Sequence, residues 1–196
     1  MAVIFFILKG LLLNPRAKFL HTSYSGDLAL VNSGIIKDLI QDPLYQAINP
    51  LQLRVDTKAK ARWYTKHGGG MMAAAQGGQV TGFRAGRMEK DEFTGAIIID
   101  DPIKPEDAFS RPIREKVNRT FNTTISNRVA QQDVPIILIM QRTHEDDLAG
   151  FLLKGGSEEQ WHHLKIPAYI GADPKPYPAQ WTHGIEIPYL LPVGPL

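Results

Sequence analysis

The sequence contains no cysteine among its 196 residues. Disulfides, thiolate nucleophiles and cysteine zinc sites are therefore excluded, and a reducing cytoplasm is compatible with the composition. An excess of charge of one sign is also lacking, because the formal net charge is only +2. Binding of duplex DNA usually requires a clustered basic face, so this net charge alone predicts no nucleic-acid partner. Hydrophobic residues (43%) and charged residues (21%) occur in the proportions of a folded globular protein.

The apolar N-terminus is too short for a membrane span. Residues 1–13 are apolar apart from Lys9 and Gly10, and Asn14 ends the run, whereas a membrane helix needs about 20 apolar residues. A signal peptide usually has a basic residue before its apolar core and small residues at a cleavage site, and this stretch has neither. We expect a buried strand or helix here, with a membrane or export role as the alternative.

A third absence concerns phosphate binding. A phosphate-binding loop has the pattern Gly-x-x-x-x-Gly-Lys-Ser/Thr, in which the lysine contacts the phosphates and the hydroxyl contacts Mg²⁺. No Gly-Lys pair occurs anywhere in the chain. The glycine-rich stretch 68–86 lacks that lysine, so we interpret its glycines as sites of close packing between two strands, joined by a tight turn at Gly77 and Gly78.

Buried apolar runs alternate with helical spacing, which predicts an α/β fold with a mostly parallel sheet flanked by helices. Short apolar runs predict strands at residues 18–24, 95–101, 134–140 and 164–170. Helices are predicted at residues 25–43, at residues 105–128 with a kink near Pro112, and at residues 145–154. Residues 54–66 carry no clear pattern. The recurring prolines of residues 171–196 predict an extended linker or tail.

Two carboxylates follow a buried strand in the segment GAIIIDDP, residues 95–102. Open α/β sheets place their ligands at the carboxyl ends of their strands, which is where Asp100 and Asp101 stand. In P-loop ATPases the first such acid helps to hold Mg²⁺, usually through water, and the next polarises the attacking water. Asp100 suits the metal-linked role and Asp101 the second. The alternative is a strand that simply ends in a turn, because Asp-Pro commonly opens turns.

A second buried run ends in the polar residues Gln141, Arg142 and Thr143. Gln141 has the hydrogen-bonding capacity of a sensor for the γ-phosphate or its water, and Arg142 could neutralise phosphate charge. The alternative is that Gln141 caps the sheet and Arg142 pairs with Asp100 or Asp101.

The acidic run HEDD, residues 144–147, invites a metal interpretation. Adjacent helical residues point in different directions, however, and rarely converge on one ion. Capping and the helix dipole are sufficient to explain an acidic first turn. A metal-dependent hydrolase that uses Asp100, Asp101 and His144 is therefore the least favoured hypothesis.

Six segments together resemble the large subunit of tailed-phage terminase, the motor that packages DNA into procapsids. They are KFLHTSYSGDLA (18–29), GGQVTGFRAG (77–86), AIIIDDPIKPEDAFS (96–110), FNTTISNRV (121–129), IMQRTHEDDLAGFLL (139–153) and WHHLKIPA (161–168). They occur in the family's order with compatible spacing and cover roughly residues 11–170.

The family has an N-terminal P-loop ATPase domain, whose ATP hydrolysis drives translocation of double-stranded DNA, and a C-terminal nuclease domain of ribonuclease H type. The resemblance implies a partial P-loop NTPase core of the RecA/ASCE-like type over residues 18–170, with ATP and Mg²⁺ as cofactors. It makes Asp100 the Mg²⁺-linked acid and Asp101 the catalytic carboxylate, at a place where many relatives have Asp-Glu. Gln141 falls in the segment that couples hydrolysis to motion. Candidate contacts to nucleotide, DNA or a neighbouring subunit are Arg84, Arg87, Arg128 and Arg142.

The implied partners are double-stranded DNA, the terminase small subunit, the portal protein and other large subunits, in the host cytoplasm and without a membrane. The chain departs from the family at both ends. Residues 1–17 stand where relatives carry the phosphate-binding loop, and residues 171–196 stand where the linker to the nuclease begins. We therefore expect a fragment with weak ATP binding and little or no turnover. The alternative is a non-catalytic module that binds DNA or an intact terminase subunit. Independently of this choice, residues 1–8 are a candidate replacement strand for the strand that the phosphate-binding loop follows in relatives.

Overall fold

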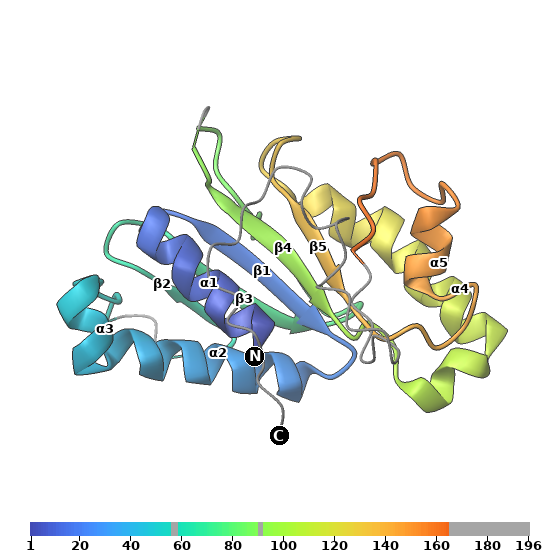
Figure 1. Cartoon of the computed structure of the whole chain (residues 1–196), viewed down its shortest axis with the longest axis horizontal. Coiled ribbons are helices and arrows are strands. Elements are labelled where there is room, and N and C mark those ends of the chain that lie inside the picture. The colour runs from blue at the N-terminus through green and yellow to red at the C-terminus, as the bar shows by residue number, and fades with distance from the viewer. Residues whose placement is uncertain (56–58, 90–91, 165–196) are drawn as a thin grey trace, which may run out of the picture. The chain divides into compact units, whose positions relative to one another are not determined.

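A computed structural model describes residues 1–55, 59–89 and 92–164 of the chain. The chain divides into two compact units, Met1–Trp161 and His162–Leu196, and only residues 162–164 of the second are described. The first unit has the predicted α/β fold, with a mostly parallel five-stranded sheet flanked by helices (Figure 1). Leu164 is not in a strand, and the rest of the strand predicted at 164–170 and the tail at 171–196 lie outside the described residues.

The order of the strands in the sheet is β2-β3-β1-β4-β5. Their bounds are β1 Lys18–Ser23, β2 Arg62–Tyr64, β3 Gly70–Ala75, β4 Gly95–Asp100 and β5 Ile136–Ile139. β1 pairs in parallel with β3 and with β4, β4 pairs in parallel with β5, and β2 joins β3 in antiparallel orientation. The predicted strands at 18–24, 95–101 and 134–140 are thus confirmed, each slightly shorter than predicted.

The glycine-rich stretch forms one strand, β3, and the predicted pair of strands within it is wrong. The chain does turn at Gly77, whose φ is +77°, but the partners of β3 come from β1 and from β2, which lies in the stretch without a clear pattern. Gly70 explains part of this arrangement, because a Cβ at this position would collide with the backbone carbonyl of Trp63. The glycine therefore serves close packing between β3 and β2, which form an antiparallel hairpin with each other, and not a hairpin within the glycine-rich stretch.

Side chains of the central strands alternate between two hydrophobic cores, as strand geometry requires. Phe19 and Ile98 face the core that contains buried residues of α1 (Ala2–Leu13) and α2 (Gly26–Gln41). Leu20 and Ile97 face the core that contains buried residues of α4 (Arg111–Thr120) and α5 (Leu148–Leu153). Figure 1 shows α1 lying across the face of β1, with α4 and α5 grouped near β5.

The apolar N-terminus forms the helix α1, so the prediction of a buried strand or helix is confirmed as a helix. Ile7 and Leu11 are fully buried in the first core, where the rings of Phe6 and Phe19 meet edge to face at 6.4 Å. Residues 1–8 are therefore not a replacement strand, because β1 already has β3 and β4 as neighbours. In the part of the chain that the structure describes, no helix is long and apolar enough to cross a membrane.

The helix α2 ends just before Pro43, as predicted, and Pro43 then begins a further short helix, α3 (Pro43–Ile48). Asp42 caps α3 by accepting a hydrogen bond from the Leu44 amide. The buried face of α2 consists of Ala29, Ser33, Ile36 and Ile40. Several residues of the predicted apolar pattern are at least one-third exposed instead, namely Leu28, Val31, Ile35 and Leu39.

The single helix predicted at residues 105–128 is wrong, because the chain is interrupted there. It forms a 3-10 helix, α4, a π-helical turn and a second 3-10 turn, at Pro105–Phe109, Arg111–Thr120, Phe121–Ile125 and Ser126–Arg128 respectively. Pro112 stands in the first turn of α4, where its missing N–H leaves no helical hydrogen bond unmade, so it begins the helix instead of kinking it. The helix α5 is shorter than predicted and is followed by Gly155 with a φ of +80°.

Candidate functional site

The two carboxylates lie where three parallel strands end. Asp100 is the last residue of β4, in register with Ser23 of β1 and Ile139 of β5. The backbone ladder continues through Asp101, whose N–H donates to the Ile139 carbonyl and whose carbonyl accepts from the Tyr24 N–H, each at 2.9 Å. Parallel pairing therefore holds the backbone of both acids at the carboxyl edge of the sheet, between β1 and β5.

Asp101 has an unusual backbone conformation. Its φ is +43°, and in the described ranges it is the one residue other than glycine with a positive φ. Aspartate tolerates the left-handed region better than most residues, but the conformation is still strained, and such strain is concentrated at functional sites. The side chains no longer alternate between the two faces of the sheet at Asp101, because the turn into Pro102 begins there. The backbone of Asp101 nevertheless still forms hydrogen bonds with the neighbouring strands.

The acids repel each other and have no ion-pair partner among the described residues. Burial raises the pKa of the half-buried Asp100 carboxyl, and the neighbouring charge of Asp101 raises it further, while the N-terminal ammonium acts in the opposite direction. Within the described ranges, neither carboxylate takes part in a hydrogen bond or an ion pair through its side chain. A divalent cation would relieve this repulsion, and Mg²⁺ is commonly held by one or two carboxylates together with substrate phosphates.

A cavity of about 220 Å³ lies beyond the ends of β1 and β3; Pro102, the residue after the two acids, lines it, but neither acid does. Its wall includes Tyr24, Gln76 and two lysines, Lys104 and Lys116. The ammonium of Lys104 lies 5.8 Å from the centroid of the Tyr24 ring. Gln76 accepts a hydrogen bond from the Thr22 hydroxyl at 3.3 Å, but its amide nitrogen is buried without a partner in the described chain.

These groups could hold an anion in the cavity, although the carboxylate of Asp107 also lines it. Two ammonium groups and an unpaired amide N–H are donors that suit phosphate or carboxylate oxygens. Sequence reasoning missed all four lining residues. A signal exists for two of them, because Tyr24 and Gln76 directly follow strands whose carboxyl ends meet at this edge. Lys104 and Lys116 come from the segment between β4 and β5, where only the tertiary fold brings them back to the edge.

Gln141 follows β5 by two residues and is exposed. It lies beyond the end of the strand next to β4, so it belongs to the same edge as Asp100 and Asp101. No contact joins its side chain to either acid in the described chain. Its role as a sensor or coupling residue stays a prediction.

Arg142 pairs with a different carboxylate from the one predicted. Its Nε donates to Asp147 at 2.9 and 3.0 Å, and not to Asp100 or Asp101. Its Nη2 donates to the carbonyls of His144 and Glu145 at 3.3 and 3.2 Å. The guanidinium is thus committed to holding the segment that leads into α5, and it forms no ion pair with Asp100 or Asp101.

The other candidate arginines are not brought to the acids. Arg87 bonds Glu89 at 3.0 Å and acts electrostatically on Lys18, which begins β1 at the edge opposite Asp100. The strand end at Lys18 also accepts a hydrogen bond from Gly86, and the adjacent Ala85 bonds the carbonyl of Arg128. Arg84, Arg87 and Arg128 therefore lie near the amino edge of the sheet.

The arginines that could form a basic face are partly engaged elsewhere. Arg111 pairs with Glu115 at 2.7 Å, Arg87 with Glu89, and Arg114 is buried. These contacts do not favour the alternative of a DNA-binding module. His144 does not join the acids either: its Nδ1 accepts from the Asp146 amide at 3.0 Å. In the described ranges, no group of three or more His, Asp or Glu residues could hold a metal ion.

No protein-family model and no curated protein sequence matches this chain.

Proposed function

We propose that the carboxyl edge of this sheet is the hydrolysis edge of a P-loop NTPase core of the terminase large-subunit type. The observation that carries the proposal is a pair of mutually repelling carboxylates, Asp100 and Asp101, at the end of a buried parallel strand and without an ion-pair partner in the described chain. A strained backbone at Asp101 and a cavity that is lined by Pro102 and two lysines support the same edge. The resemblance of the six sequence segments to the terminase large subunit supports this family and supports ATP as the substrate.

Each acid has a distinct part in this proposal. Asp100 would hold Mg²⁺ through water, and Asp101 would accept a hydrogen bond from the attacking water and orient it. Mg²⁺, when bound, would neutralise phosphate charge and lower the pKa of Asp100. Lys104 and Lys116 attract the anionic substrate to the neighbouring cavity. Gln141, at the end of the adjacent strand, couples hydrolysis to movement of the chain.

The missing lysine limits the activity. Backbone amides and the Gly-Lys pair of a phosphate loop supply much of the affinity for nucleotide in such enzymes, and this chain has no Gly-Lys pair. We therefore expect weak ATP binding and little or no turnover by the chain alone. The corresponding role of the intact terminase large subunit is ATP-driven packaging of double-stranded DNA. Its partners in that role are the small subunit, the portal protein and other large subunits, in the host cytoplasm.

The first test is ATP hydrolysis by the purified chain and by Asp101→Asn. Turnover should be far below the usual range of about 1–100 per second for phosphoryl-transfer enzymes, and any residual turnover should disappear in the variant. Rapid hydrolysis that depends on Asp101 would contradict the argument from the missing lysine. Rapid hydrolysis that survives the substitution would contradict the role of the acids.

The second test does not need turnover. Carboxyl-detected NMR follows the titration of Asp100 with and without millimolar Mg²⁺, in the wild type and in Asp101→Asn. Mg²⁺ should lower the apparent pKa of Asp100 in the wild type and have a smaller effect in the variant, because one carboxylate is lost. The exposed Asp38 is the matched control. An equal response of Asp38 and Asp100 would show that the edge has no preference for the cation.

A further inference from the structure

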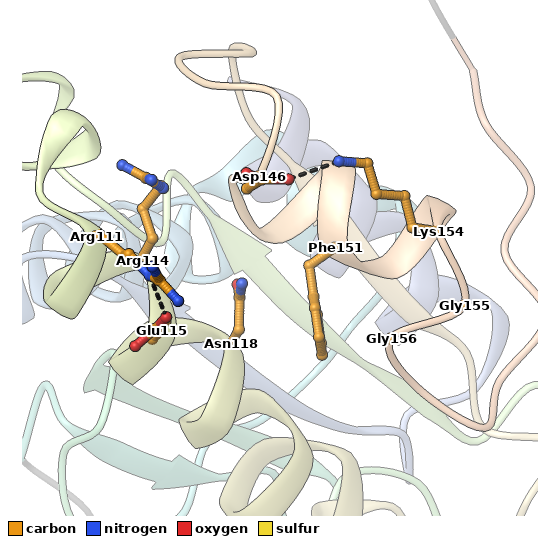
Figure 2. Close-up of a pocket in the computed structure, with 9 residues that line it drawn as sticks. All are labelled: Arg111, Arg114, Glu115, Asn118, Asp146, Phe151, Lys154, Gly155 and Gly156. Atoms are coloured by element: carbon orange, nitrogen blue, oxygen red, sulfur yellow. Dashed lines mark hydrogen bonds and ion pairs between the residues drawn. The ribbon is translucent and has the colours of Figure 1, made fainter.

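Two cavities in the described chain differ in how their charged side chains are compensated. The larger one, of about 500 Å³, lies between α4 and α5 (Figure 2). Its rim carries two ion pairs, both drawn in Figure 2: Arg111 pairs with Glu115 at 2.7 Å, and Lys154 pairs with Asp146 at 2.6 Å. Arg114, on its wall, interacts electrostatically with Asp146. The charges of this cavity therefore compensate one another and indicate no ligand of either sign.

The smaller cavity, of about 220 Å³ beyond the ends of β1 and β3, has lysines without such partners. Lys104 and Lys116 both line it, and both are exposed. The carboxylate of Asp107 lines it as well, but in the described chain no ion pair joins either lysine to Asp107 or to another acid. The lining therefore carries two cations against one anion, and the ammonium N–H groups are available to an anionic ligand.

The position of Lys104 is fixed by its neighbours in the chain and by Tyr24. Ile103, the residue before it, is buried in the core that contains α4 and α5, and the Lys104 carbonyl accepts from the Asp107 N–H at 3.1 Å. The Lys104 ammonium lies 5.8 Å from the centroid of the Tyr24 ring, which also lines the cavity. Since the Tyr24 N–H donates to the Asp101 carbonyl at 2.9 Å, this cation is tied to the sheet edge that bears the acids.

The size and the lining of this cavity favour phosphates over a nucleoside. Pockets that enclose a whole small ligand usually measure about 300–1,000 Å³, and this cavity is smaller. Tyr24 is the one aromatic side chain among the described residues that line it. A base commonly stacks on an aromatic ring, but the Lys104 ammonium already lies over the ring of Tyr24. The part of a ligand that fits the cavity is therefore small and anionic.

We propose that this cavity binds the phosphate end of a triphosphate and makes no contact that selects the base. The inference rests on the function proposed above, because it takes the ligand of the hydrolysis edge to be a triphosphate. Lys104 donates to phosphate oxygens from its place over Tyr24, and Lys116 adds a second positive charge from α4. Lys104 thus supplies part of the affinity that a Gly-Lys pair supplies in P-loop enzymes. The ligands are ATP, other nucleoside triphosphates and inorganic tripolyphosphate alike.

The probes are ATP, GTP, inorganic tripolyphosphate and adenosine, each with excess Mg²⁺ and the whole chain. Calorimetry gives the dissociation constants, and amide chemical-shift mapping locates the bound probe. ATP, GTP and tripolyphosphate should bind with dissociation constants within about threefold of one another, whereas adenosine should not bind. The shifts should map to the amides of Tyr24 and Gly77, which line the smaller cavity, and not to Gly155, which lines the larger one.

Substitutions of Lys104 test its part in the binding. Lys104→Gln should weaken the binding of tripolyphosphate at least about fivefold, because a charged donor is lost. Lys104→Arg should keep most of the affinity, since a guanidinium retains the charge and also lies well over an aromatic ring. Lys66→Gln is the matched control, because this exposed lysine lines neither cavity and its loss changes the net charge equally. Both lysines are exposed, so all three variants should fold like the wild type.

Three results would overturn the proposal. Equal weakening by Lys104→Gln and Lys66→Gln would reduce the binding to a general attraction between charges. A preference of more than about tenfold for ATP over GTP and tripolyphosphate would show that the base is recognised. Absence of shifts at Tyr24 and Gly77 at about 10 mM tripolyphosphate, which detects dissociation constants in the millimolar range, would show that the cavity takes no phosphate.

The Mg²⁺ titration of Asp100 separates a failure of this inference from a failure of the proposed function, because that titration uses no nucleotide and no variant of a lysine. A response of Asp100 to Mg²⁺ without binding that depends on Lys104 would contradict this inference alone. Binding that depends on Lys104, without a response of Asp100, would support a phosphate site in the cavity and contradict the hydrolysis edge.

Discussion

Arg142 and Asp147 form an ion pair in which one guanidinium nitrogen, Nε, lies 2.9 and 3.0 Å from the two oxygens of the carboxylate. Asp147 is 1% exposed and also accepts hydrogen bonds from the amides of Thr143 and Gly150, at 3.0 and 2.9 Å. The bond from Gly150 makes Asp147 the N-cap of α5. One buried carboxylate therefore holds the turn between β5 and α5, which carries Gln141 on one side and the cavity between α4 and α5 on the other.

We predict that Asp147→Ala lowers the free energy of unfolding by about 2–4 kcal/mol, because the helix loses its cap and buried amides lose their acceptor. Arg142 is 43% exposed and can return to water, so the loss should stay below that of a fully buried pair. Urea unfolding followed by circular dichroism measures the change. Asp146→Ala, at an exposed pair with Lys154, is the matched control and should cost less than about 1 kcal/mol. Equal effects of the two substitutions would contradict the role given to Asp147.

Gly95 should be intolerant of any side chain. Its φ is +133°, and a Cβ there would overlap the carbonyl oxygen of Lys18 in the neighbouring strand. Gly95→Ala should therefore destabilise the protein by more than about 3 kcal/mol. Gly82→Ala also places alanine at a positive φ, +74°, but nothing lies within 4 Å of the added Cβ, so the expected cost is about 1 kcal/mol. Thermal unfolding compares the two variants, and a similar loss in both would mean that backbone conformation alone explains the effect.

We predict that the protein loses stability in mild acid, because the ring of His21 is buried in its neutral form. The ring is buried between the Ile98 carbonyl at 3.3 Å and the Asn32 amide at 3.1 Å, and burial lowers its pKa to about 4 from 6.5. Between these values the unfolded chain binds a proton and the folded chain does not. The free energy of unfolding should therefore fall as the pH falls from 6.5 to about 4, by up to about 3 kcal/mol from this group.

The measurement is urea unfolding at several pH values for the wild type and for His21→Gln. The variant keeps a polar side chain but has no titrating ring, so its stability should depend less steeply on pH across this window. Identical slopes for the two proteins would assign the acid sensitivity to other groups and would contradict a neutral His21 in the folded state.

Asp100→Asn should stabilise the protein at pH 7, by up to about 1 kcal/mol. Burial and the charge of Asp101 raise the pKa of Asp100, so the folded state holds its proton to higher pH than the unfolded chain does. Stability contributed by the protonated form is lost as the pH rises through this range, and the amide avoids that loss. The advantage of the variant should therefore grow between acidic and neutral pH. Asp38→Asn, at an exposed position, is the control; a destabilised Asp100→Asn would indicate an unseen partner for the carboxylate.

The strands that bear the acids were predictable because their signals are local. GAIIID is a run of apolar residues that can only be buried on both faces, and its end at two aspartates is readable without any partner strand. The end of the helix α2 before Pro43 and the turn at Gly77 follow in the same way from the backbone restrictions of single residues. The break before α4 escaped prediction, because the same proline that can kink a helix also begins one.

Contacts that depend on the tertiary fold could not be predicted from one sequence. β2 closely precedes β3 in the chain, but it has three residues and no pattern of its own, so its pairing with β3 had no local signal. In the sequence, Arg142 has candidate carboxylate partners before it, at Asp100 and Asp101, and after it, at Asp147. Only the turn before α5 brings one of them, Asp147, into an ion pair with Arg142. Lys104 and Lys116 reached the carboxyl edge through the fold of the segment between β4 and β5.

The amino-acid sequence by itself determined the α/β class, the acid-tipped strand and the absence of a Gly-Lys pair, because hydrophobic period, composition and residue order are properties of neighbouring residues. Tertiary structure alone decided that Asp100 and Asp101 have no ion-pair partner in the described chain, and that Arg114 and Asn118 line one cavity with Phe151. The reason is physical: which charges compensate each other depends on distances of a few ångströms between residues far apart in the chain, and burial makes those distances matter.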